Sequence, residues 1–192
     1  MKTDIILAGV GGQGILSIAT IIGQAALSQG LFIKQAEVHG MSQRGGDVQS
    51  NLRLSSTPIY SDLIAVGGAD LIIAMEPMEA LRYQSYLSRE GWIITASAPF
   101  VNIPVYPDAE VLKADLSRLP RVITLDIDAL ARDNKMPKAA NMILLGAAAD
   151  VLGMDYACLE EAVRTVFGAK GEAIVDMNLR ALAIGRSHGV KN

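Results

Sequence analysis

The sequence predicts an α/β fold of three layers, with a mainly parallel sheet, helices on both of its faces and a C-terminal helical portion. Over residues 1–125, short aliphatic runs typical of buried strands alternate with segments whose apolar residues recur at helical spacing. From residue 126 onward the pattern is helical alone. Hydrophobic residues make up 51% of the 192 residues, which is enough for a sizeable core. We therefore expect one domain, 1–192, with a sheet core over about 1–125 and a helical portion over about 126–192.

The chain is expected to begin with a β-α-β unit. Residues 5–8, Ile-Ile-Leu-Ala, are an aliphatic run typical of a strand buried on both faces. Apolar residues then recur at helical spacing from Ile15 to Ala26, and Gly30 suits the end of that helix. Residues 31–38 follow as the second strand. Right-handed connections between parallel strands would place helices on both faces of the sheet.

The remaining chain adds strands and then helices. Residues 48–54 predict a half-exposed strand, because apolar and polar residues roughly alternate there. A helix is expected from residue 76 to about 87, and Pro99, Pro104 and Pro107 mark an irregular connection. Further strands are expected at residues 70–75, 91–96 and 121–125. Four helices are expected at residues 127–134, 137–152, 159–167 and 172–186, with Pro137 in a first turn and Gly153 at a helix end.

Charge and cysteine content argue against several classes of protein. The net charge is −3 and no basic patch is evident, unlike in a nucleic-acid-binding protein. The chain has one Cys and two distant His, fewer ligands than an iron–sulfur cluster or a structural zinc site needs. The one Cys, Cys158, lies in an Ala- and Leu-rich helical stretch, which favours a buried inert thiol over a nucleophile.

No segment predicts export or membrane insertion. The chain runs from Met1 directly into a strand and shows no signal peptide. The longest apolar runs, such as residues 142–149, are too short to cross a bilayer. We therefore expect a soluble, cytoplasmic protein that contacts no membrane.

A glycine turn, residues 9–14, joins the first strand to the first helix. Gly9, Gly11 and Gly14 have the Gly-x-Gly-x-x-Gly spacing of loops that hold dinucleotides or phosphates, and Gly12 lies between them. Glycines let the backbone approach an anion, and the N–H groups and dipole of the helix N-terminus attract it. Three interpretations stay open: a turn that only permits close packing, a contact with a phosphate or partner, and a NAD site.

A polar segment, residues 37–47, follows the second strand. It places an acid, an imidazole, an amide and a guanidinium among glycines. Ligands of open parallel sheets bind beyond the carboxyl ends of the strands, so this segment and the glycine turn should share one edge of the molecule. The candidate ligand- or partner-facing residues of this segment are Glu37, His39, Ser42, Gln43, Arg44, Gly45 and Gly46.

Two of these side chains suggest a chemistry. Arg44 suits a carboxylate or phosphate through its planar fork, and His39 suits a donor or proton shuttle. The alternative is a solvated hairpin connection in which Glu37 pairs with Arg44. No Gly-x-Ser-x-Gly elbow is present, no Gly-Lys-Ser/Thr run follows the glycines, and no paired metal carboxylates stand at helical spacing. The residues thus predict an anion-friendly edge, and the catalytic residues stay unknown.

Four separated motifs resemble the gamma-type domain of the 2-oxoacid:ferredoxin oxidoreductase family. Residues 9–14, Gly-Val-Gly-Gly-Gln-Gly, and residues 37–46, Glu-Val-His-Gly-Met-Ser-Gln-Arg-Gly-Gly, carry the resemblance. Residues 76–83, Glu-Pro-Met-Glu-Ala-Leu-Arg-Tyr, and residues 138–147, Lys-Ala-Ala-Asn-Met-Ile-Leu-Leu-Gly-Ala, extend it over nearly the whole chain. The second motif is similar to the form in members that act on indolepyruvate, and residues 96–107 resemble the family less.

The resemblance implies a division of labour between two subunits. In the family, thiamine diphosphate with its Mg²⁺ and the iron–sulfur clusters lie in a large partner subunit. The complex decarboxylates a 2-oxoacid, reduces ferredoxin and transfers the acyl group to coenzyme A. The resemblance therefore implies that this chain is a small oxidoreductase subunit, without a cofactor of its own and inactive alone. Residues 9–14 and 37–46 would lie at the inter-subunit edge, near the path of coenzyme A or substrate.

Three other interpretations remain open. The glycine turn alone suggests a free-standing NAD(P)-dependent oxidoreductase. That fold also needs a ribose-binding acid about 20 residues on, whereas residues 29–36 contain no acid and Glu37 comes late. A second interpretation is a non-enzymatic structural subunit whose loops serve packing only. The third is the equivalent subunit for branched-chain oxoacids or oxoglutarate, although the form of residues 37–46 favours indolepyruvate.

Overall fold

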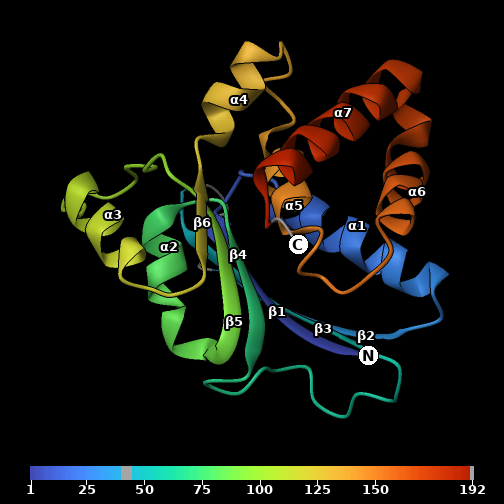
Figure 1. Ribbon diagram of the computed structural model, residues 1–192, viewed down its shortest axis with the longest axis horizontal. Helices are drawn as coiled ribbons and strands as arrows, with labels where there is room; N and C mark the ends of the chain where they lie inside the picture. Colours follow the sequence, from blue (N-terminus) through green and yellow to red (C-terminus); the bar gives the residue numbers. More distant parts are fainter. Residues whose placement is uncertain (40–44, 191–192) are drawn as a thin grey trace.

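The computed structural model describes residues 1–39 and 45–190, around a six-stranded sheet of order β2-β3-β1-β4-β5-β6 (Figure 1). β1, β4, β5 and β6 are parallel, whereas β3 runs antiparallel to both of its neighbours, β1 and β2. The predicted mainly parallel sheet is therefore confirmed, with one antiparallel strand inside it. The strands are β1 (Lys2–Val10), β2 (Phe32–His39), β3 (Asp47–Ser55), β4 (Ala69–Ala74), β5 (Leu87–Ala96) and β6 (Val122–Leu125).

Helices cover both faces of the sheet, as predicted: α1, α5, α6 and α7 lie on one face, and α2 and α3 on the other (Figure 1). No helix among the described residues is long and apolar enough to cross a membrane. The α-helices are α1 (Ile15–Ser28), α2 (Pro77–Arg82), α3 (Ala109–Ser117), α4 (Ile127–Asp133), α5 (Ala140–Ala148), α6 (Tyr156–Phe167) and α7 (Glu172–His188). Two short 3-10 helices are η1 (Gln84–Tyr86) and η2 (Gly168–Lys170).

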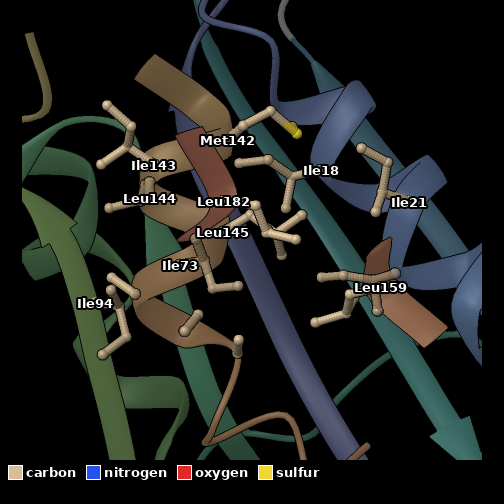
Figure 2. Close-up of a cluster of buried hydrophobic side chains, with 14 of the residues drawn as sticks. Ile18, Ile21, Ile73, Ile94, Met142, Ile143, Leu144, Leu145, Leu159 and Leu182 are labelled. Carbon is tan, nitrogen blue, oxygen red and sulfur yellow. The ribbon is translucent and has the colours of Figure 1, made fainter. Parts of the chain in front are cut away.

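The alternation of side chains along the strands produces two cores. Ile5 and Leu7 of β1 join the larger core with α1 and α5, whereas Ile6 and Ala8 join the smaller core on the opposite face. Figure 2 shows the larger core, where side chains from α1, α5, β4 and β5 converge. Every α5 residue from Met142 to Ala148 is buried, because α5 lies between the sheet and α7.

α5 and α7 cross at two glycines. A Cβ added to Gly146 would overlap the carbonyl oxygen of Leu182, and a Cβ added to Gly185 would overlap that of Ile143. Any larger residue at either position would force the two backbones apart. The crossing seats α7 on α5 and thereby carries Asn178 of α7 to the edge of the sheet described below.

The predicted β-α-β unit needs one correction. β2 follows α1 as expected, but it does not pair with β1, because β3 returns antiparallel and inserts between them. The insertion also buries β3 more than its alternating pattern predicts. Ser50, Asn51 and Leu52 are buried, and Asn51 Oδ1 accepts the Ile64 N–H at 3.1 Å. The polar residues of β3, which predicted an exposed face, instead make hydrogen bonds to the neighbouring strands β1 and β2 and to the loop that contains Ile64.

Several boundaries also differ from the predictions. α3 was not predicted, since three prolines precede it; Asp108 caps it, and Leu112 and Leu116 anchor it. The predicted helix from 76 to about 87 ends at Arg82, because η1 follows and β5 begins earlier than expected. α5 begins at Ala140, so Pro137 precedes the helix and does not occupy its first turn.

Candidate functional site

A cleft of about 670 Å³ opens at the carboxyl edge of the parallel strands. Gly12, Gln13 and Gly14 form one side of it, directly after β1. Met75, just past β4, and Ile127, just past β6, also line it. Open α/β sheets bind ligands beyond the carboxyl ends of their strands, so this cleft is the candidate site.

The glycines of the turn differ in what a side chain would meet at each position. A Cβ on Gly9 would lie 2.7 Å from Ile15 Cδ1, and one on Gly14 would lie 2.6 Å from Asn141 Nδ2. At Gly9 and Gly14, the space that a Cβ would need is therefore taken up by side chains of the protein itself. Gly12 has φ +103°, yet an added Cβ there would meet no described atom within 4 Å. Gly12 is thus the glycine that leaves its backbone open to a bound group.

Gln13 keeps the turn in shape. Its Oε1 accepts the Val10 N–H at 2.7 Å, and its Nε2 donates to the Met75 carbonyl at 3.4 Å. Asn141 Nδ2 donates to the Gly14 carbonyl at 3.2 Å, which ties the turn to α5. The turn is therefore held by its own Gln13 side chain and by the Asn141 side chain of α5.

The polar lining of the cleft favours an anion. Among the described residues, Lys138 and Lys170 both line it, against one acid, Asp128. α1 and α5 begin at the cleft without a side-chain cap and without an acid in the first turn. The positive ends of both helices therefore face the cleft with no charge to offset them in the first turn, and at α5 the Asn141 Oδ1 accepts one N–H, that of Met142.

The remaining lining adds one acceptor and an apolar wall. Asn178 is 4% exposed, and its Nδ2 donates to the Ile174 carbonyl at 2.7 Å. Its Oδ1 accepts no hydrogen bond from the described residues, so it is free to accept an N–H from a ligand. The apolar wall consists of Met75, Phe100, Ile127, Phe167, Ile174 and Met177. A ligand with an anionic end and an apolar or amide-bearing body suits this lining.

Two acids next to the cleft are buried away from it. Glu76 and Glu79 are 0% and 1% exposed, and burial raises the pKa of both. Arg82 Nε lies 2.8 Å from Glu79 Oε2 and partly offsets that shift. Burial, with Asp47 nearby, raises the pKa of Tyr83 to about 12. None of these groups lines the cleft, so they shape its surroundings and do not face a ligand.

The glycine turn and the second predicted segment meet at backbone atoms. Gly11 N–H donates to the Gly46 carbonyl at 2.8 Å, and Gly45 N–H to the Gly11 carbonyl at 3.5 Å. Gly45 and Gly46 thus lie against the turn, while Gly12 and Gly14 line the cleft. Ser42, Gln43 and Arg44 lie outside the described residues, and their roles stay predictions.

Glu37 and His39 lie farther from the turn than expected. His39 and Gly9 both pair with Val48 of β3, so two strand spacings, about 10 Å, separate their backbones. Glu37 is half-buried on β2 and does not line the cleft. The inserted strand therefore removes Glu37 from the place that a ribose-binding acid would need.

Several lining residues were not predicted as site residues. Lys138 and Asn141 belong to residues 138–147. These residues resemble the family, but the sequence did not predict that they line a site. Lys138 and Asn141 lie at the start of α5, which α4 separates from β6, so the sequence offers only an indirect signal for this sheet edge. Lys170, Asn178 and Phe100 carry no such signal, because only tertiary packing brings them to the cleft.

A family model for pyruvate ferredoxin/flavodoxin oxidoreductase matches residues 4–188. The chain belongs to this family. The indolepyruvate oxidoreductase subunit IorB of Archaeoglobus fulgidus is 35% identical over 99% of this chain and 96% of its own length. IorB of Pyrococcus horikoshii is 33% identical over 95% of this chain and 93% of its own length. The ketoisovalerate oxidoreductase subunit VorA of Methanothermobacter marburgensis is 30% identical over 97% of this chain, but over 36% of its own length.

Solved oxidoreductase structures share the fold. Subunit PORC of pyruvate oxidoreductase from Thermotoga maritima has a TM-score of 0.72 at 20% identity, covering 97% of this chain and 96% of that one. The 2-oxoglutarate:ferredoxin oxidoreductase of Magnetococcus marinus, with 2-oxoglutarate, coenzyme A and succinyl-CoA bound, has a TM-score of 0.76 at 22% identity. It covers 97% of this chain and 30% of that chain. The fold is thus a separate subunit in one oxidoreductase and part of a longer chain in another.

The residues of this chain do not fit the redox cofactors of the reaction. Iron–sulfur clusters are usually held by four thiolates, and Cys158, half-buried against the larger core, is the single Cys of the sequence. Across residues 1–39 and 45–190, no three His, Cys, Asp or Glu side chains are grouped as metal ligands. The described residues of this chain therefore offer no ligand set for an iron–sulfur cluster.

Proposed function

We propose that the chain is the small subunit of a 2-oxoacid:ferredoxin oxidoreductase that oxidatively decarboxylates indolepyruvate, releasing carbon dioxide, transferring the acyl group to coenzyme A and passing the electrons to ferredoxin. The main support for this proposal is the 32–35% identity, over nearly the whole chain, to four archaeal IorB subunits of indolepyruvate oxidoreductases. Relatives named for ketoisovalerate and 2-oxoglutarate are 26–30% identical. The equivalent subunit for one of those oxoacids is therefore the second candidate.

A larger partner subunit would supply thiamine diphosphate with Mg²⁺ and the iron–sulfur clusters. Decarboxylation of a 2-oxoacid needs an electron sink that a cofactor provides and that protein side chains lack. The single Cys of this chain supports placing the clusters in the partner. The complex would work in the cytoplasm, where ferredoxin and coenzyme A are available.

A NAD site finds little support in the geometry. In the dinucleotide-binding fold the first two strands are neighbours, which brings the ribose-binding acid beside the glycine turn. Here β3 separates β2 from β1, and Glu37 does not line the cleft. The glycine turn therefore suits another anion.

We propose that the cleft holds the phosphate-bearing end of coenzyme A. The open backbone at Gly12, the two uncapped helix N-termini and the ammonium groups of Lys138 and Lys170 would bind phosphate oxygens. The apolar wall and Asn178 Oδ1 would contact the amide-bearing arm. In this role the chain binds and orients coenzyme A, while the bond-making steps occur in the partner.

We predict that Lys138→Gln and Lys170→Gln each raise the KM of the assembled complex for coenzyme A by about tenfold or more, since each removes a charge-assisted hydrogen bond. kcat should change little, because the lost contact is to a bound group remote from the chemistry. Initial rates of ferredoxin reduction against coenzyme A concentration measure both constants. Lys113→Gln on α3, whose side chain is 77% exposed, is the matched control. An unchanged KM for coenzyme A in both cleft variants would contradict this assignment.

The loop beside the cleft suits a subunit contact. Val101 and Val105 are 70% and 86% exposed, and Phe100 and Ile103 are also exposed. Exposed apolar side chains gathered in one loop mark interaction surfaces. In two relatives this fold covers 30–36% of a longer chain, which supports a neighbouring domain or subunit beside it in the family.

We predict that Val101→Asp weakens binding to the large subunit by tenfold or more, because a desolvated unpaired charge is strongly unfavourable at an interface (roughly 2–5 kcal/mol). Val66→Asp is the control, because Val66 is equally exposed at 71% but lies in the loop between β3 and β4. Titration of one subunit with the other by interferometry gives both dissociation constants. Equal effects from the two substitutions would argue against the loop as the contact surface.

A further inference from the structure

The loop of residues 97–107, between β5 and α3, is not held by burial of its own apolar side chains. It contains no helix or strand, and Phe100, Val101, Ile103 and Val105 are all exposed. Phe100 nevertheless forms part of the cleft wall. A wall residue on such a loop has a defined position only if polar contacts fix the loop backbone.

One carboxylate provides two of those contacts. Glu76 Oε1 accepts the Phe100 N–H at 3.3 Å and also accepts the Tyr106 hydroxyl. Glu76 Oε2 accepts the Glu79 N–H at 2.9 Å, which caps α2. Glu76 therefore joins both ends of the loop to the N-terminus of a helix, directly after the cleft residue Met75.

The choice of glutamate at this position has no explanation in helix capping alone. Ser, Thr, Asp and Asn are the favoured N-cap residues, because a short side chain reaches the second or third N–H. Three other helices of this chain follow that rule, with Asp108, Asp126 and Asp155 as caps. Glu76 is 0% exposed, so its carboxylate is also fully desolvated. The extra methylene gives it the reach to bind the loop while it caps α2.

We propose that Glu76 is a positioning residue that clamps the loop of residues 97–107 and thereby holds Phe100 in the wall of the cleft. The clamp deepens the proposed function and rests on it, since Phe100 would then set how coenzyme A lies in the cleft. Burial raises the pKa of Glu76, consistent with a carboxyl group kept from water for a structural purpose. Asn102 Nδ2, which donates to the Gly45 carbonyl at 2.8 Å, is the second tie of the loop and connects it to the glycine turn.

The test compares Glu76→Asp with Asp155→Ala. Glu76→Asp keeps a favoured cap on α2 but is too short to hold the loop, whereas Asp155→Ala removes a cap and leaves the loop intact. Hydrogen exchange on the free chain should show the Phe100 amide exchanging about tenfold faster or more in Glu76→Asp and unchanged in Asp155→Ala. Tyr106→Phe should accelerate the same amide to a smaller extent. In the assembled complex, Glu76→Asp should raise the KM for coenzyme A several-fold with kcat nearly unchanged.

Two results would overturn the clamp. One is a Phe100 amide that exchanges at the wild-type rate in Glu76→Asp. The other is a KM change that Asp155→Ala reproduces at an equal loss of thermal stability, which would make the effect one of general stability. If the wild-type complex does not use coenzyme A, the proposed function fails, while the exchange measurement on the free chain still decides whether the clamp exists.

Discussion

Replacing Arg53 by methionine is expected to lower the free energy of unfolding by about 3–5 kcal/mol. Arg53 Nε lies 2.7 Å from Asp4 Oδ1, and Arg53 Nη2 lies 3.1 Å from Asp4 Oδ2. The Asp4 side chain is 3% exposed, so the substitution leaves a buried carboxylate with Lys2 as its remaining cation. Arg53 Nη1 also donates to the carbonyls of Ser61 and Leu63, which ties down the loop between β3 and β4. Urea denaturation followed by the fluorescence of the single Trp, Trp92, measures the loss.

The pH dependence gives this prediction a second test. Burial raises the pKa of Asp4, but the hydrogen bonds from Arg53 and Lys2 outweigh it and leave the pKa below its ordinary value. A lowered pKa contributes stability that is present above the ordinary pKa and is lost as the pH falls through the folded value. Without Arg53 the desolvated Asp4 is protonated more easily. The deficit of Arg53→Met should therefore be largest near neutral pH and shrink toward about pH 4.

The control is Arg118→Met, which removes an exposed ion pair. Arg118 Nη1 lies 2.8 Å from Asp115 Oδ1, and the Arg118 side chain is 77% exposed. Exposed pairs of this kind contribute about 0–1 kcal/mol. A loss in Arg53→Met no larger than that in Arg118→Met would show that the network around Asp4 is not important for stability.

Replacing Gly185 by alanine is expected to destabilise the protein by about 3 kcal/mol. The new methyl group would overlap the carbonyl oxygen of Ile143, and backbone cannot move aside as a flexible side chain can. α7 would have to separate from α5 along a fully packed interface. The corresponding fall in the midpoint of thermal unfolding is roughly 6–12 °C for a domain of this size.

Gly23→Ala is the matched control, because it also adds one methyl group to a glycine inside a helix. A Cβ at Gly23 meets its nearest neighbour, Ile33 Cδ1, at 4.0 Å, an ordinary contact. Alanine is the better helix former by about 1 kcal/mol, so this variant should be as stable as the wild type or more so. If both variants unfold at the same temperature, the crossing of α5 and α7 is looser than described.

Local patterns predicted most of the elements, while pairing between distant elements escaped prediction. The aliphatic run at residues 5–8 and the helical spacing after Gly14 each determine one element, and both were found. The position of β3 could not be predicted, because strand order depends on which strands pair across the whole sheet. α3 is hard to predict, because Pro99, Pro104 and Pro107 come just before it and it has only two buried apolar residues, Leu112 and Leu116.

In the candidate site, too, local features were predictable and contacts between distant elements were not. The glycine turn could be located from the sequence, because its spacing is local and parallel strands end at one edge. Lys170 and Asn178 reach the cleft only through the folding of η2 and α7 over α5, which no local pattern encodes. The prediction that Glu37 lies beside the glycine turn requires β2 to pair with β1. Because β3 lies between β2 and β1, Glu37 does not lie beside the glycine turn.

A reconstitution assay with and without the large subunit tests whether this chain is the cofactor-free subunit of the oxidoreductase. Purified alone, the chain should contain no iron and no thiamine diphosphate and should not oxidise indolepyruvate. Mixed with a thiamine- and cluster-binding subunit, it should support indolepyruvate-dependent reduction of ferredoxin that requires coenzyme A. Stoichiometric iron in the isolated chain, turnover without the partner, or a mixture that oxidises neither indolepyruvate nor another 2-oxoacid would rule out this assignment.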